Sequence, residues 1–144
     1  MKIMLQQQVL LLLGFALITG IMGCGKAHTR KLLLHKTWHV INVTPPENGS
    51  FDIEATRAAE EMKNGFYKNA SFTFLDNGLF FTDFNGKTDT GRYEINPGGK
   101  IISLYPLHGN KIYEQIRIRE LNDSILSFTT VMANFDMMLH LKAY

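Results

Sequence analysis

The chain has 144 residues, with 15 Lys and Arg against 13 Asp and Glu, which is the length of one domain with almost balanced charge. Near-neutrality removes the electrostatic argument for a nucleic-acid partner, and we expect none. The single cysteine, Cys24, excludes an intramolecular disulfide.

The first 23 residues have the pattern of an export signal. Residues 9–22 (VLLLLGFALITGIM) contain no charged side chain, and Lys2 supplies a short basic start. The run is shorter than the roughly 20 apolar residues that cross a bilayer, but it matches the apolar region of a signal peptide. A buried core helix is the alternative, and it would normally show a polar stripe. We therefore predict a signal peptide over residues 1–23.

The end of that run, Ile21-Met22-Gly23-Cys24, resembles the lipobox of bacterial lipoproteins. The resemblance implies that the signal peptide is of the lipoprotein type and that Cys24 is the lipid attachment point and mature N-terminus. A plain secretory signal with a spare thiol is the alternative. Each buried methylene contributes about 0.8 kcal/mol, so several acyl chains would hold the protein at the membrane. Lys26 does not suggest inner-membrane retention, and we expect an outer-membrane lipoprotein facing the periplasm or cell surface.

The segment after Cys24 is polar and shows no periodicity. Residues 25–30 (GKAHTR) would span at most about 20 Å if extended. We predict that residues 24–31 form a lipidated tether and that residues 32–144 form one domain.

That domain begins with a β-branched and aromatic stretch at residues 35–44, which ends at Pro45-Pro46. The one helix that we predict follows at residues 53–64. Ala55, Ala59 and Met62 recur there at helical spacing, and Asp52 can cap the first turn.

Short alternating runs fill the rest of the chain. Turn signals such as Asn85-Gly86 separate them. They lie at residues 70–75, 79–84, 88–95, 100–106, 112–121, 124–131 and 137–143. Closing such a meander leaves no strand edge exposed, so we predict an all-β fold, an eight-stranded antiparallel up-and-down barrel with one short helix after the first strand.

A resemblance to a known family supports the barrel. Trp38 near the start of the first strand, the helix-bearing connection after it, and TGRYEI at residues 90–95 resemble the small lipocalin-like lipoproteins of Gram-negative bacteria. The resemblance covers roughly residues 32–142. It implies a lipocalin-like barrel in which Trp38 packs across the closed end.

The sequence contains no recognisable catalytic or metal-binding constellation. His35 and His39 share a strand face, but four strand residues separate them by about 13 Å, too far to hold one metal. Glu60 and Glu61 lie on the predicted helix without a facing partner for acid–base chemistry. We therefore expect a protein that is not an enzyme and that needs no metal or cofactor.

Two groups of side chains are candidate binding residues. One group is aromatic and shares the predicted barrel interior: Trp38, Phe72, Phe74, Tyr93 and Phe128. It either lines a ligand cavity or fills the core, and filling is the commoner use. The other group, Arg117 and Arg119, lies on one strand face. It forms either a carboxylate- or phosphate-binding patch or an ordinary solvated face.

Two functional hypotheses follow. The first is an envelope lipoprotein that binds a small apolar or amphipathic ligand within the barrel. The second is a non-catalytic interaction module with a filled barrel, whose rim, loops or arginine face contact another envelope protein. In both, the lipid anchor makes the membrane a partner.

Overall fold

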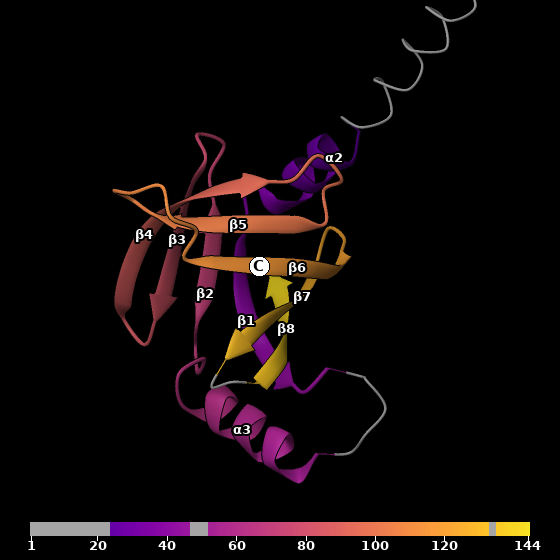
Figure 1. Cartoon of the computed structure of the whole chain (residues 1–144), viewed down its shortest axis with the longest axis vertical. Coiled ribbons are helices and arrows are strands. Elements are labelled where there is room, and N and C mark those ends of the chain that lie inside the picture. The colour runs from indigo at the N-terminus through magenta and orange to yellow at the C-terminus, as the bar shows by residue number, and fades with distance from the viewer. Residues whose placement is uncertain (1–23, 47–51, 133–134) are drawn as a thin grey trace, which may run out of the picture.

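The structure is a computed structural model that describes residues 24–46, 52–132 and 135–144. The predicted signal peptide lies outside these residues. The chain forms two helices and eight strands in this region (Figure 1). In order they are α2 (Cys24–Leu33), β1 (Thr37–Thr44), α3 (Ile53–Asn64), β2 (Ser71–Phe74), β3 (Leu79–Phe84), β4 (Lys87–Ile95), β5 (Ile101–Pro106), β6 (Glu114–Leu121), β7 (Ile125–Met132) and β8 (Phe135–Ala143).

The eight strands form a closed barrel in which each strand pairs with the next in the chain. The first and last strands close it, since β1 pairs with β8 in antiparallel register, Val40 opposite Leu141. The predicted eight-stranded antiparallel barrel with a short helix after the first strand is therefore confirmed.

Local sequence explains much of this path. β3 and β4 meet across a two-residue turn, with Phe84 opposite Lys87. Both turn residues have positive φ, 55° for Asn85 and 82° for Gly86, as the favoured hairpin turn requires. Turn geometry then fixes the register, which sends Phe80 and Thr82 to the interior.

α3 occupies the connection between β1 and β2, at the end of the barrel where β1 finishes (Figure 1). The Asp52 carboxylate accepts hydrogen bonds from the Glu54 and Ala55 amides at 2.9 and 3.2 Å, which satisfies donors that a helix start leaves without partners. Ala55 and Ala59 are the buried side chains of this helix. We call this the α3 end.

The predicted tether is wrong as a description of residues 24–31. Residues 24–33 form α2, which packs on the opposite end of the barrel, where β1 begins. The Thr29 hydroxyl donates to the Gly99 carbonyl at 2.8 Å, and Leu33 is completely buried. The folded unit therefore includes residues for which the sequence predicts a linker. The turn that receives them lies 70 residues away in sequence, so local periodicity does not reveal it.

Candidate functional site

Cys24, the predicted lipid attachment point, is exposed at the first residue of α2. At 3.6 residues per turn, Ala27 and Lys31 share its side of the helix, opposite the side that carries Thr29 and Leu33. Cys24, Ala27 and Lys31 are all exposed, whereas Thr29 and Leu33 are buried. The thiol therefore lies on the outward face of a helix that is itself fixed to the barrel.

Backbone proximity fixes the start of α2. A Cβ added to Gly25 would lie 2.6 Å from the Gly98 carbonyl oxygen, which is closer than real Cβ contacts come. Gly99, whose φ is 73°, is equally close to Gly25, because a Cβ added to Gly99 would meet the Gly25 carbonyl. Glycine is thus required where helix and turn meet.

Side chains fix the remainder of α2. The Arg30 guanidinium donates to the Asp76 carbonyl in the β2–β3 turn. The Trp38 indole N–H donates to the Leu33 carbonyl at 3.1 Å, and the ring is completely buried. Trp38 therefore packs at the end of the barrel that α2 covers, as the lipocalin-like resemblance implies. Three separate turns or strands hold α2, which leaves it no freedom to act as a spacer.

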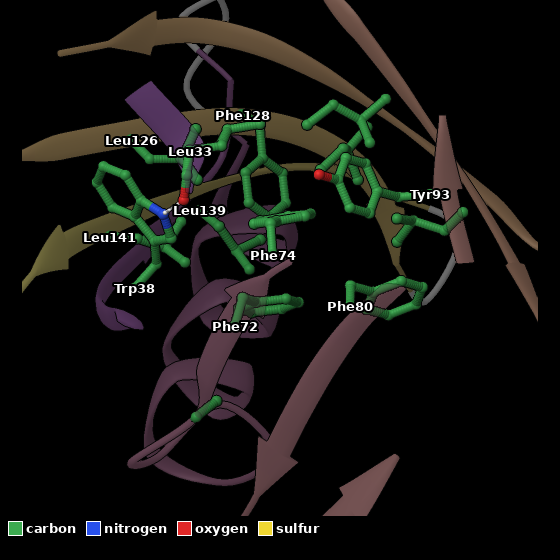
Figure 2. Packing of buried hydrophobic residues seen from close by; sticks show 14 of the residues in the cluster. Leu33, Trp38, Phe72, Phe74, Phe80, Tyr93, Leu126, Phe128, Leu139 and Leu141 are labelled. Atoms are coloured by element: carbon green, nitrogen blue, oxygen red, sulfur yellow. Dashed lines mark hydrogen bonds between the residues drawn. The ribbon is translucent and has the colours of Figure 1, made fainter. Parts of the chain in front are cut away.

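The five predicted ligand-lining residues do come together in the interior, where they pack against each other and against aliphatic neighbours (Figure 2). Phe74 and Tyr93 make an edge-to-face contact with ring centroids 5.1 Å apart. Phe72 and Phe128 make another at 6.0 Å. All five are at most 7% exposed. These side chains fill space, and none of the five lines either of the two outer pockets described below.

Arg117 and Arg119 also come together, in a groove on the outside of the barrel. We call it the arginine groove; its volume is about 330 Å³. Arg119 is the extra residue where the register between β6 and β7 shifts, and like Arg117 it is exposed. Among the described residues, no carboxylate forms an ion pair with either guanidinium. The lining comes from four strands and from the segment that follows β1: Pro46, Ile101, Gln115, Ile116, Arg117, Arg119, Thr129, Thr130, Val131 and Asp136.

A larger pocket, of about 580 Å³, opens at the α3 end, where β4 continues past β5. The last pair between these strands is Gly91 with Pro106, so residues 87–90 extend beyond it. We call this space the β4–β5 pocket. Its apolar and aromatic lining includes Phe80, Tyr105, Pro106, Leu107 and Tyr113. This pocket is not predictable from the sequence pattern, because it depends on where two strands stop pairing.

Arg92 shapes this pocket by holding the segment that follows β5. Its guanidinium donates to the Gly109 carbonyl and, at 3.3 Å, to the Asn110 side chain. It also lies over the Tyr105 ring, 5.6 Å from the centroid. These contacts hold the turn from β5 to β6 against the outer face of β4. The arginine of the TGRYEI stretch positions a loop, a role that the sequence does not reveal.

Phenols and carboxylates gather at the α3 end. Burial, reinforced by the Glu114 carboxylate, raises the pKa of the Tyr67 phenol well above its ordinary value of 10.0. Burial also raises the pKa of Tyr113, with Glu114 and Asp89 adding to the shift. Both phenols therefore stay protonated at neutral pH and can donate hydrogen bonds but cannot act as general bases.

Within the described part of the chain, no group of three or more His, Cys, Asp or Glu side chains is placed to hold a metal ion. None of the helices in that part is long and apolar enough to cross a membrane.

These features define a class, a closed eight-stranded antiparallel β-barrel with a helix at each end. No family model matches the sequence. No curated protein matches it either. The fold is similar to the crystal structure of a DUF4847 family protein from Bacteroides vulgatus ATCC 8482, with a TM-score of 0.52 over 78% of this chain and 94% of that one. Identity is 9%, so the likeness supports the fold alone.

Proposed function

We propose that this protein is a non-catalytic interaction module of the cell envelope, anchored to the outer membrane by lipid on Cys24. The observation that carries the module is the filled interior: Trp38, Phe74 and Phe128 are nearly or completely buried and leave binding to the outer surface. An eight-stranded barrel is just wide enough for side chains to fill it, and these side chains do.

The arginine groove is the surface that we propose for the partner. Two guanidinium groups that line one groove match carboxylate or phosphate groups in charge. Ile101 and Val131 add an apolar border to the same groove. A partner segment that carries carboxylates beside apolar side chains would match both the guanidinium groups and the apolar border.

Fatty-acid labelling tests the anchor. Cells that express the full chain are grown with a clickable fatty acid, and we expect label on the wild type and none on Cys24→Ala. Lys26→Ala, two residues along the same helix, is the matched control and should keep the label. Equal labelling of wild type and Cys24→Ala would disprove attachment at this residue.

Tryptophan emission tests the filled barrel. Because Trp38 is completely buried, its emission should be blue-shifted and should not respond to hydrophobic probes or extracted lipids. A saturable shift on adding such a ligand would favour a carrier with an internal site instead.

Site-specific crosslinking tests the arginine groove. A photo-crosslinker at Thr129, within the groove, should yield a discrete protein adduct in intact envelopes. Arg117→Glu with Arg119→Glu should abolish it, because reversal repels the proposed carboxylates. Lys63→Glu with Lys68→Glu, exposed at the α3 end, provides a matched double reversal that should leave the adduct unchanged.

The β4–β5 pocket supports a second candidate, the binding of a small amphipathic molecule. Its volume of about 580 Å³ falls in the range of ligand sites, and its lining combines aromatic and apolar side chains with Asp89. We expect any such ligand to compete with a fluorescent fatty acid and to leave Trp38 emission unchanged, since Trp38 lies at the other end. Leu107→Arg should weaken binding, because it places a charge at the apolar wall. Binding that Leu107→Arg does not change would exclude this pocket.

A further inference from the structure

The outward face of α2 is polar and basic. Cys24, Ala27, His28 and Lys31 are exposed on it, and none of them is a large apolar residue. Such a face can rest on charged headgroups but offers no side chain for insertion into the acyl region. Over its ten residues the helix contains three cations and no carboxylate.

The neighbourhood of α2 extends this charge. Lys100 is exposed in the turn that receives the start of the helix, one residue after Gly99. α3, at the opposite end, carries the carboxylates of Glu54, Glu60 and Glu61 against the cations of Arg57 and Lys63. The two helices at the ends of the barrel therefore differ in formal charge, +3 for α2 and −1 for α3.

The position of Cys24 relates this asymmetry to the anchor. Consecutive Cα atoms are about 3.8 Å apart, and Gly25 already contacts the Gly98 backbone, so no flexible segment separates a lipid on Cys24 from the folded barrel. Acyl chains at this thiol would begin on the same helix face that carries Lys31.

We propose that the α2 end of the barrel docks flat on an anionic lipid surface, with Lys31 and Lys100 against the headgroups and the α3 end directed away from the membrane. This inference rests on the proposed lipid anchor, and it adds to it an orientation. The arginine groove and the β4–β5 pocket then stay accessible to partners or ligands, because neither includes a residue of α2.

Photo-crosslinking to lipid in intact envelopes tests the orientation on the full chain. Benzoylphenylalanine is placed at His28, on the outward face of α2, or at Glu60, exposed on α3. Phospholipid adducts are quantified by mass spectrometry, and fatty-acid labelling of the same samples reports the anchor separately. We expect phospholipid adducts mainly at His28.

Charge reversal tests the electrostatic part. Lys31→Glu should lower the lipid adduct at His28 by at least about fivefold, because loss of one cation near an anionic surface already corresponds to about 1 kcal/mol. Lys63→Glu is the matched control, because Lys63 occupies the last turn of α3 as Lys31 occupies the last turn of α2. It should leave the adduct at His28 unchanged.

The outcomes separate the two proposals. Label on Cys24 with equal lipid adducts at His28 and Glu60, or with protein adducts in place of lipid at His28, would overturn the orientation and leave the anchor standing. Absence of label with adducts mainly at His28 would overturn the anchor and leave a peripheral docking surface. Absence of both label and preference would overturn both.

Discussion

The two ends of the barrel are closed by different means. At the α2 end a helix lies against a glycine turn, and the Trp38 N–H joins its last residue to β1. At the α3 end a capped helix spans the connection between two strands, beside phenols, carboxylates and an open pocket. One end is sealed by contacts distant in sequence, and the other is built from local signals. The sealed α2 end is suited to a fixed attachment. The α3 end, where the β4–β5 pocket opens, is suited to exchange with a partner.

The largest expected effect breaks the sealed end. Trp38→Ala should lower the free energy of unfolding by about 3–5 kcal/mol, because it removes a completely buried ring and leaves a cavity. Denaturant unfolding of residues 24–144 with Cys24→Ser measures this. Trp38→Phe keeps most of the ring and loses only the hydrogen bond to Leu33, so it should cost clearly less. A loss below about 1 kcal/mol for Trp38→Ala would contradict the packing described.

The next effect concerns the glycine contact. Gly25→Ala should destabilise by about 1–3 kcal/mol, since its methyl group meets the Gly98 carbonyl and must push the helix away. Amide hydrogen exchange over residues 26–33 should accelerate. Gly98→Ala is the matched control, because its Cβ would meet nothing nearer than 3.7 Å, and it should change stability by less than about 0.5 kcal/mol. Equal effects would show that α2 does not depend on this contact.

A smaller effect concerns the other helix. Asp52→Ala should cost about 1 kcal/mol, because two amides at the start of α3 lose their acceptor. Asp52→Asn keeps an oxygen in place and should cost less. Hydrogen exchange should rise in α3 and stay unchanged in α2. A rise in both helices would mean that the two ends are coupled through the barrel.

The same contrast explains what the sequence could predict. The eight strands and α3 were predictable because alternation, turn residues and the Asp52 cap act over a few residues. α2 was not, since its buried positions hold Thr29 and Leu33 beside Gly25, too few apolar residues for a periodic signal. Its stability comes from Gly98 and Gly99, far along the chain.

The candidate sites divide in the same way. Strand alternation correctly placed Phe72 and Phe128 in the interior, and Arg117 and Arg119 on one outer face. Alternation cannot decide whether interior rings leave space between them, because that depends on contacts across the barrel. The β4–β5 pocket depends on unequal strand lengths and on the hydrogen bonds of Arg92, neither of which any local pattern records.

The smallest expected effect is a difference between the two ends of the barrel in how stability depends on pH. Burial raises the pKa of both Tyr67 and Tyr93 above 10.0, the value expected in the unfolded chain. A phenol whose pKa is raised in the folded state keeps its full contribution to stability below pH 10 and loses that contribution as the pH rises further. Ionisation of either phenol in alkali should therefore weaken the fold. Nearby Glu114 adds to the shift at Tyr67, whereas Arg30 of α2 opposes it at Tyr93.

Phenylalanine substitutions measure the difference between the ends. The wild type should lose stability as the pH rises above 10, and denaturant midpoints measured across that range report the loss. Tyr67→Phe should reduce this loss more than Tyr93→Phe does. Arg30→Gln is the diagnostic third variant. Without the guanidinium, burial at Tyr93 acts unopposed, and the alkaline loss that Tyr93→Phe removes should grow. An unchanged loss would mean that the charge of α2 does not reach the barrel interior, and that its cations act only on the outer surface.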